Sequence, residues 1–158
     1  MKTVDQLLEE ARKQLPRRVS PQETLGEMQA GALVIDIRGN EQQRRDGLMP
    51  GALVVRRNVL EWRCDPTSEW HHPGVTRHDQ RIIIVCDEGY QSSLAAANLQ
   101  QMGMTKATDM DGGFQLWRAR GLPVVPYGEG RLLMDRVRAV VKRMWGKLRP
   151  RHGRAREN

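Results

Sequence analysis

The spacing of hydrophobic residues near the amino terminus predicts two helices. Apolar residues recur at steps of three and four over residues 3–15, which is the period of one helix face. The segment "SPQETLGEMQAG" predicts a second helix, with Ser20 as N-cap, Pro21 at the first helical position and Glu23 three residues after the cap. We expect Gly31 to end this helix.

Four short apolar runs further along the chain predict strands. They are "ALVIDI" (32–37), "GALVV" (51–55), "RIIIV" (81–85) and "KATDM" (106–110). The run "RIIIV" is the clearest, because β-branched isoleucines and a valine suit a strand that is buried on both faces.

The segments "SSLAAANLQQMG" and "GGFQLWRARG", which follow the third and fourth predicted strands, are typical of helices that end at a glycine. Residues 56–80 are rich in Pro, His, Asp and Arg, and we expect them to be irregular. Strands that alternate with helices predict an α/β fold with a mainly parallel central sheet and helices on both faces.

The composition fits one folded domain. The chain has 158 residues, of which 39% are hydrophobic and 28% charged, which is enough for one domain with a core of its own. Two cysteines cannot form a disulfide framework, and the amino-terminal segment mixes both charge signs among its apolar positions, unlike a secretion signal. We therefore expect a cytoplasmic protein, in which Cys86 could remain a free thiol.

The formal net charge of +7 is concentrated at the carboxyl terminus. Residues 127–158 contain ten Lys or Arg and three acids, which leaves 16 residues of each sign in residues 1–126. We predict a domain over 1–126, a basic amphipathic helical extension over 127–148 and a disordered basic tail over 149–158. Residues 131–148 could bind an acidic protein or an anionic membrane surface, or pack on the chain's own domain. The neutral body makes nucleic acid an unexpected partner.

Cys86 is the candidate reactive residue. It directly follows "RIIIV", and a polar loop from Asp87 to Gln91 separates it from a helix that is predicted to begin near Ser92. Ligands of such sheets bind beyond the carboxyl ends of the strands, where loop N–H groups and a helix dipole favour an anion such as a thiolate. Gly89 would provide a turn with positive φ. We expect the sulfur to be exposed within this ring of amides; the alternative is a buried cysteine that only ends a strand.

Three segments occur in a characteristic order over about residues 18–126. They are "LVIDIRGNEQQRRDGLMPGALV", the strand–Cys86–loop–helix unit and "ATDMDGGFQLWRARGLPV". Together they resemble a single-domain rhodanese, a sulfurtransferase-like protein. The segments "NVLEWR" and C-x-E-G-Y-x-S-S-L-A-A resemble actinobacterial rhodanese-like proteins in particular. The resemblance implies a rhodanese-like fold and a sulfur-transfer activity that needs no cofactor and no metal.

The resemblance also implies a mechanism. Cys86 matches the family's cysteine, which takes the outer sulfur from a small or protein-bound donor and holds it as a persulfide. A thiol or a cyanide-like acceptor then removes that sulfur. A persulfide is an anion at neutral pH, so the main-chain N–H groups of residues 87–92 are expected to stabilise it. The candidate substrate-binding residues are Asp87, Glu88, Gly89, Tyr90, Gln91, Ser92 and Arg57, with Tyr90 and Gln91 at the pocket mouth.

Other matching residues are expected to have structural roles. Asp36 and Arg38 match the family's Asp-x-Arg pair, which we interpret as scaffolding of the turn and loop. Gly112, Gly113 and Trp117 match the closing structural motif.

The Cys86 loop departs from the commoner family pattern. Gln91 stands where Arg or Lys is usual, Asp87 where Arg is frequent, and Leu48 where His is usual. Asp87 and Glu88 place negative charge near the sulfur, which opposes thiolate formation and repels thiosulfate. We therefore expect weak activity with thiosulfate, unless these side chains point outward.

Arg56 and Arg57 follow the predicted strand 51–55 and could reach the same edge of the sheet. We hypothesise that one of them, with Arg57 as the candidate, supplies the positive charge that the loop lacks. The alternative is that both are solvated surface arginines.

Two other kinds of site fit the sequence poorly. A phosphatase of the Cys-x5-Arg type needs an arginine where Ser92 stands, so the bidentate phosphate clamp is missing. Cys64 with His71, His72 and His78 lacks regular metal-ligand spacing.

The alternative to a sulfurtransferase is a non-catalytic rhodanese-fold module that binds a partner or a membrane surface through its basic C-terminal helix. The intact Cys86 favours the enzyme, whereas the acidic loop without a basic residue favours the module.

Overall fold

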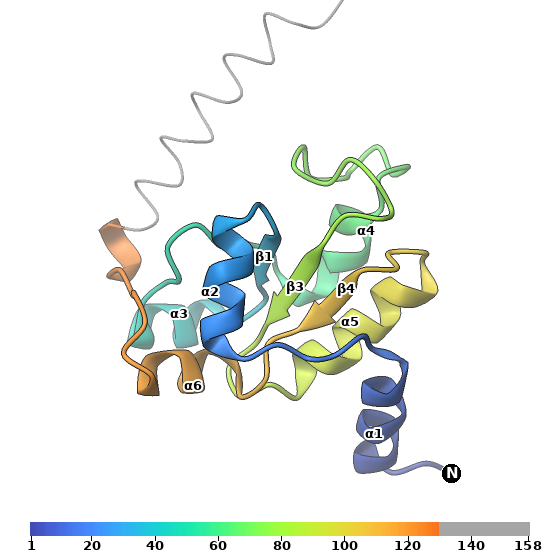
Figure 1. Cartoon of the computed structure of the whole chain (residues 1–158), viewed down its shortest axis with the longest axis horizontal. Helices are drawn as coiled ribbons and strands as arrows, with labels where there is room; N and C mark the ends of the chain where they lie inside the picture. The colour runs from blue at the N-terminus through green and yellow to red at the C-terminus, as the bar shows by residue number, and fades with distance from the viewer. Residues whose placement is uncertain (130–158) are drawn as a thin grey trace, which may run out of the picture.

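The structure, a computed structural model, describes residues 1–129 (Figure 1). The predicted amphipathic extension lies outside the described residues from residue 130 on, and so does the predicted basic tail over 149–158.

A four-stranded parallel sheet forms the centre of the molecule, in the order β2-β1-β3-β4 (Figure 1). The strands are β1 (Leu33–Asp36), β2 (Leu53–Val54), β3 (Ile82–Val85) and β4 (Ala107–Asp109). Each lies within one of the four predicted runs, and every pairing is parallel. The predicted α/β fold with a parallel sheet is therefore confirmed.

The register of the sheet brings three chain segments to one edge. Asp36 of β1 pairs with Val85 of β3, and Ile84 of β3 pairs with Asp109 of β4. Because parallel strands share their carboxyl edge, Cys86 follows β3 between the segments that leave β1 and β4. The loop after Cys86 can therefore contact both of them.

Six α-helices that begin and end within residues 1–129 surround the sheet. They are α1 (Val4–Gln14), α2 (Pro21–Gln29), α3 (Asn40–Asp46), α4 (Leu60–Cys64), α5 (Gln91–Gln101) and α6 (Gly113–Ala119). The predicted start of α2 is confirmed, because the Ser20 side chain accepts from the Glu23 N–H and the Glu23 side chain accepts from the Ser20 N–H. Gly31 follows the end of α2 at φ +99°.

Two of these helices, α3 and α4, were not predicted, and neither was a short 3-10 helix. Residues 56–80, which were expected to be irregular, contain the 3-10 helix η1 (Arg57–Val59) and α4. The sequence of α3, "NEQQRRD", has no apolar residue and therefore no amphipathic signal. Tertiary contacts hold α3 in place instead, since Arg45, Asp46 and the buried Gln43 all lie on it.

Side chains alternate along β3 between two cores. Ile82 and Ile84 lie in the core shared with α4 and α5, whereas Ile83 and Val85 lie in the core shared with Phe114 and Trp117 of α6. All four residues of β3 are buried, as expected for a central parallel strand with both faces covered. The helices therefore cover both faces of the sheet (Figure 1).

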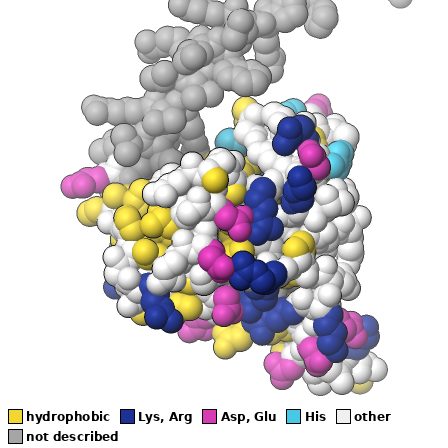
Figure 2. Space-filling model, viewed as in Figure 1, with side chains coloured by type: hydrophobic (Ala, Val, Ile, Leu, Met, Phe, Trp, Pro, Cys, Tyr) yellow, Lys and Arg dark blue, Asp and Glu magenta, His cyan; other side chains and the backbone are white. Residues whose placement is uncertain are grey.

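The surface of the described chain is mixed in charge. Lys and Arg side chains lie next to Asp and Glu side chains over the face in Figure 2, in keeping with the balanced charge of residues 1–126. None of the helices in residues 1–129 has the length and apolar character that crossing a membrane requires.

Candidate active site

Cys86 follows β3 directly, and the loop after it folds back on its sulfur. The Gly89 N–H donates to the Cys86 Sγ at 3.2 Å and the Ser92 N–H donates to it at 3.3 Å. Gly89 has φ +83°, which confirms the predicted positive-φ turn. The expected cradle of main-chain amides therefore exists, and two of the six N–H groups of residues 87–92 form it.

The expected exposure of Cys86 is wrong. The residue is only 4% exposed, because other parts of the chain pack on the loop that covers it. The Phe114 N–H donates to the Cys86 carbonyl at 2.9 Å, and the Gln115 N–H donates to the Asp87 carbonyl at 3.0 Å. The start of α6 is thus fastened to the cysteine loop by main-chain bonds.

The pair Gly112–Gly113 permits this close approach. A Cβ on Gly113 would lie 2.5 Å from the Asp87 carbonyl oxygen and 2.6 Å from the Gly89 nitrogen. Gly113 also has φ +59°, where other residues are strained. The closing motif, expected to be structural, therefore contacts the cysteine loop, and Trp117 of the same motif is buried at 1% exposure.

Ser92 connects the sulfur to a buried carboxylate. The Cys86 thiol donates to the Ser92 Oγ at 3.2 Å, and the Ser92 hydroxyl donates to Asp109 Oδ2 at 2.9 Å. Asp109 is fully buried and also accepts from the Ser93 hydroxyl at 2.8 Å. Arg18 donates to both of its carboxylate oxygens, at 2.8 and 3.0 Å. A buried carboxylate needs such donors, and Asp109 has four of them.

The Arg18 side chain is mostly buried, with 19% exposed, and it also pairs with Asp111 at 2.6 Å. Burial lowers the pKa of the Arg18 guanidinium, but hydrogen bonds and charge attraction from Asp109 and Asp111 outweigh it, so that its pKa is raised overall. Arg18 therefore remains a cation between the two carboxylates.

Two guanidinium groups hold the carbonyl of Gly89. The Arg12 Nη2 and the Arg18 Nη2 each donate to the Gly89 oxygen at 3.0 Å. Arg12 also donates to the Ser93 Oγ at 3.3 Å, and its guanidinium lies 5.7 Å from the centre of the Tyr90 ring. The amino-terminal segment therefore also holds the cysteine loop through hydrogen bonds to Gly89 and Ser93.

The sequence pattern did not identify Arg12, Arg18 or Asp109 as residues of the site. Arg12 and Arg18 lie 77 and 71 positions from Gly89, and neither follows a strand or matches a motif. Asp109 carried a usable signal, because an acid within a predicted buried strand requires hydrogen-bond donors.

The Asp87 carboxylate has two polar partners. The Gln115 Nε2 donates to the Asp87 carboxylate at 2.9 Å, and the Arg45 guanidinium lies 3.6 Å from it. Glu88, by contrast, is exposed and makes no hydrogen bond or ion pair with residues 1–129. Asp87 and Glu88, which are adjacent in the sequence, therefore differ in their surroundings.

The neighbour of Asp87 in this network is Asp46 at the end of α3. It accepts from Arg45 at 2.6 Å, from Arg118 at 2.8 Å and from Gln115 at 2.9 Å. Hydrogen bonding by Arg45 is the main reason why the pKa of Asp46 is lowered to about 2; burial opposes this shift and Gln115 adds to it. Asp46 is thus ionised at neutral pH and fixes Arg45 and Gln115 beside the loop.

Arg57 does not fill its predicted place at the loop. Its guanidinium forms an ion pair with Glu61 at 2.8 Å, one turn further along the chain. Within the described part of the chain, no hydrogen bond or ion pair joins Arg57 to residues 86–92. The reason is that β2 ends at Val54 and the chain then turns into η1 and α4, so that Glu61 neutralises Arg57.

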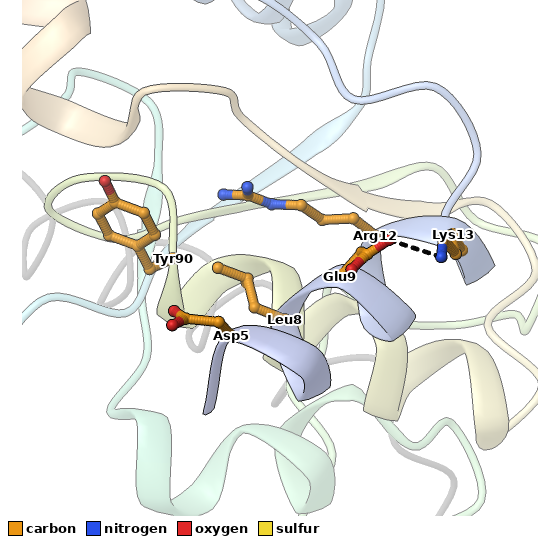
Figure 3. A pocket seen from close by; sticks show the side chains of 6 residues that line it. All are labelled: Asp5, Leu8, Glu9, Arg12, Lys13 and Tyr90. Carbon is orange, nitrogen blue, oxygen red and sulfur yellow. Dashed lines mark ion pairs between the residues drawn. The ribbon is translucent and has the colours of Figure 1, made fainter. Parts of the chain in front are cut away.

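An open groove of about 530 Å³ lies between α1 and the cysteine loop (Figure 3). Tyr90 is the loop residue that lines it, and the Arg12 side chain points along the groove toward Tyr90, while Glu9 and Lys13 form an ion pair on α1 (Figure 3). Gln91, expected beside Tyr90 at a pocket mouth, is exposed but does not line this groove, and neither does Cys86.

Asp36 and Arg38 form a buried pair behind the site. The Arg38 Nη2 donates to Asp36 at 2.7 Å and to the Gly47 carbonyl at 2.9 Å, and both side chains are at most 1% exposed. The guanidinium also lies 3.3 Å from the centre of the Phe114 ring. These contacts join the loop after β1 to α6, as expected of a scaffolding pair.

Cys64 has a different environment from Cys86. It is fully buried at the end of α4, and burial, with a smaller contribution from the Glu61 charge, raises the pKa of its thiol to about 12. No group of three His, Cys, Asp or Glu residues in the described chain is arranged to hold a metal ion.

Comparisons with known proteins agree with this geometry. Residues 20–120 match the Rhodanese-like domain family. The chain is 32% identical over 105 residues to the thiosulfate sulfurtransferase GlpE of Ectopseudomonas mendocina (strain ymp), a match that covers 65% of this chain and 85% of that protein. It is 28% identical over 93 residues to a sulfurtransferase of Allochromatium vinosum, which covers 59% of this chain and 78% of that protein. A closer likeness to actinobacterial members stays a prediction.

A solved protein of unknown function from Rhodopseudomonas palustris CGA009, described as a possible tyrosine phosphatase, has a TM-score of 0.71 and 28% identity. The likeness covers 79% of this chain and 96% of that one. In the present chain Ser92 stands where a Cys-x5-Arg phosphatase has its arginine, so the side chain of the bidentate phosphate clamp is missing here. Because the family match spans well over half of the sequence and the four-stranded parallel sheet agrees with it, the chain belongs to the Rhodanese-like domain family.

Proposed function

We propose that the protein is a cytoplasmic sulfurtransferase that carries sulfane sulfur as a persulfide on Cys86. The observation that carries the proposal is that the Cys86 sulfur accepts hydrogen bonds from the N–H groups of Gly89 and Ser92 at the carboxyl edge of the sheet. Relatives named sulfurtransferase, at 28 to 32% identity, support the same reaction class.

Sulfur transfer on Cys86 proceeds in two displacements. The Cys86 thiolate attacks the outer sulfur of the donor, a new S–S bond forms, and the donor's own bond to that sulfur breaks. With thiosulfate the electron pair leaves on sulfite. An acceptor thiolate or cyanide then attacks the outer sulfur of the persulfide and restores the Cys86 thiolate. Cys86 is a thiolate before the first displacement and again after the second, so main-chain donors that face its sulfur stabilise that anion.

Ser92 adapts to the charge state of Cys86. In the thiol form its hydroxyl accepts the S–H and donates to Asp109. When Cys86 is a thiolate or a persulfide, the Ser92 hydroxyl can rotate and donate to the sulfur. Asp109 then still keeps the donors from Ser93 and Arg18. The network can thus lose one bond without leaving a buried carboxylate unpaired.

The burial of Cys86 limits the donors that fit. At 4% exposure, the sulfur is reached by a donor that presents its outer sulfur on a narrow end, as thiosulfate, mercaptopyruvate and low-molecular-weight or protein persulfides do. Glu88 leaves a negative charge without an ion-pair partner among residues 1–129 on the cysteine loop, so we expect weak activity with thiosulfate in particular.

The second candidate function is that of a binding module without catalysis. It is favoured by the acids Asp87 and Glu88 in the loop and by the concentration of net positive charge in residues 127–158. In that case the fold would present the basic segment to an acidic protein or an anionic membrane surface.

Intact-mass measurement after brief exposure to thiosulfate, mercaptopyruvate or glutathione persulfide separates the two functions. We expect a gain of one sulfur atom, lost in Cys86→Ala and kept in Cys64→Ala, because the buried Cys64 thiol, with its pKa raised to about 12, stays protonated. Cyanide or a thiol should then remove the added sulfur. No mass gain with any of these donors would contradict the sulfurtransferase and favour the module.

A further inference from the structure

The charges that face the Cys86 loop are nearly all neutralised by a partner. Asp87 and Asp46 share Arg45, and Arg118 also binds Asp46. Behind the loop, Arg38 binds Asp36. Arg18 lies between Asp109 and Asp111. Glu88 is the acid of this group without a partner among residues 1–129.

Arg12 is the corresponding cation. Among residues 1–129 it forms no ion pair; its guanidinium donates to the Gly89 carbonyl at 3.0 Å and to the Ser93 Oγ at 3.3 Å, and it lies beside the Tyr90 ring. All three contacts are with the cysteine loop or the first turn of α5. Half-buried Arg12 therefore brings one unpaired positive charge to a loop that contains two acids and no base.

We propose that Arg12, on the amino-terminal helix α1, is a positioning residue for Cys86: it holds the Gly89–Tyr90 peptide and supplies the positive charge that the cysteine loop lacks. This inference rests on the proposed role of Cys86, and it assigns to α1, which precedes the family match over residues 20–120, a part in the reaction.

The first effect of Arg12 passes through the peptide group. The Gly89 oxygen receives charge-assisted bonds from Arg12 and Arg18, both at 3.0 Å, and the Ser93 hydroxyl lies 3.3 Å from the same oxygen. In a trans peptide the following N–H, that of Tyr90, points to the opposite side, away from the two guanidinium groups. Polarisation of the carbonyl strengthens this N–H as a donor, and it has no acceptor among residues 1–129. It is thus available to an anion on the outer sulfur.

The second effect is electrostatic. A partly buried cation within a few Å of the loop stabilises a thiolate or a persulfide on Cys86 and offsets Glu88. Arg18 contributes less net charge at this place, because Asp109 and Asp111 both bind it.

The test is the pH profile of Cys86 alkylation by iodoacetamide, a neutral reagent, in the full-length protein. In Arg12→Gln, which keeps a polar side chain of similar reach but loses the charge, we expect the midpoint of the profile to move to higher pH by about 0.5 to 1 unit. Arg12→Lys, which keeps the charge, should stay near wild type. In 1 M NaCl the difference between Arg12→Gln and wild type should shrink.

Lys13→Ala is the matched control, since it removes a positive charge from the next residue of α1, where Lys13 pairs with Glu9 and is 70% exposed. Thermal unfolding of each variant checks the fold. An unchanged midpoint in a folded Arg12→Gln, or an equal shift in Lys13→Ala, would overturn the inference. If Arg12→Gln does not fold, a shifted midpoint in Arg12→Lys would overturn it as well. No sulfur donor is present in this assay, so its result is independent of persulfide formation on Cys86. The proposed role of Arg12 can therefore be overturned while the sulfurtransferase proposal stands, and the sulfurtransferase proposal can be overturned while the role of Arg12 stands.

Discussion

Two adjacent acids beside Cys86 have opposite surroundings although the sequence presents them as equivalent. Asp87 binds Gln115 and lies 3.6 Å from Arg45, so its charge is largely compensated. Glu88 is exposed and lacks a partner in the described chain. If negative charge at the loop weakens the use of an anionic donor, the effect belongs to Glu88.

We predict that Glu88→Gln raises kcat/KM for thiosulfate. Removing one charge within about 6 to 10 Å of a dianion lowers the barrier by on the order of 1 kcal/mol at low ionic strength, which corresponds to a gain of about three- to tenfold. Steady-state kinetics in 20 mM and in 500 mM salt provide the measurement, and the gain should be smaller at high salt.

The control for Glu88→Gln is Glu69→Gln, which changes the net charge equally at an exposed position outside the cysteine loop. Equal kinetics of Glu88→Gln and wild type at low salt would show that the charge of Glu88 does not limit the donor.

At the scale of elements, the start of α6 and the loop before α5 behave as one unit. Main-chain bonds from Phe114 and Gln115 reach Cys86 and Asp87, and Gly113 leaves no room for a side chain between them. The position of the Gly89 and Ser92 amides therefore depends on how closely α6 can approach. In addition, α1 fixes the same loop through Arg12.

We predict that Gly113→Ala destabilises the protein more than Gly121→Ala. Both glycines have positive φ, +59° and +67°, so each alanine costs about 1 to 2 kcal/mol for its backbone conformation. Only at Gly113 would the new Cβ also clash with backbone, at 2.5 Å from the Asp87 oxygen; around Gly121 there is nothing within 4 Å. We expect a total loss of about 3 kcal/mol or more for Gly113→Ala, measured by urea unfolding.

The same Gly113→Ala variant should slow the alkylation of Cys86 at neutral pH, because the displaced loop no longer presents its amides to the sulfur. Gly121→Ala should leave that rate unchanged. Similar unfolding midpoints for the two variants would mean that the loop and α6 are less tightly coupled than the distances indicate.

At the scale of the whole molecule, charge is divided unevenly along the chain. Residues 1–126 contain 16 residues of each sign, and both signs are mixed on the surface shown in Figure 2. The net charge of +7 belongs to residues 127–158. Any strong electrostatic attraction to a partner is therefore expected from that segment and not from the domain around Cys86.

We predict that the full chain co-sediments with vesicles that contain anionic phospholipid, and that a chain lacking residues 128–158 does not. Each Lys or Arg near an anionic surface contributes about 1 kcal/mol, and binding should fall in 500 mM salt. Vesicles of neutral lipid serve as the control. Equal binding by the full and shortened chains would rule out a membrane tether in this segment.

Local sequence determined most of the elements and the position of the reactive sulfur. The "RIIIV" run predicted β3, the Ser20–Glu23 pair predicted the start of α2, and the order strand–Cys86–Gly89–helix predicted a loop with amides on the sulfur. These features depend on hydrophobic period, capping and glycine conformation, which act between residues a few positions apart. Where a local pattern was absent, as in the wholly polar α3, the helix was missed.

Only the tertiary structure decided which charges serve Cys86 and how far it is covered. The sequence pattern predicted that Arg57 reaches the cysteine loop, but Arg57 forms an ion pair with Glu61 instead. Arg12, 77 positions from Gly89, reaches the loop because α1 packs on α5. Cys86 is 4% exposed because Gly113 lets α6 approach its backbone. The physical reason is common to these cases: Coulomb and packing energies depend on distances in space, and the fold sets those distances independently of separation along the chain.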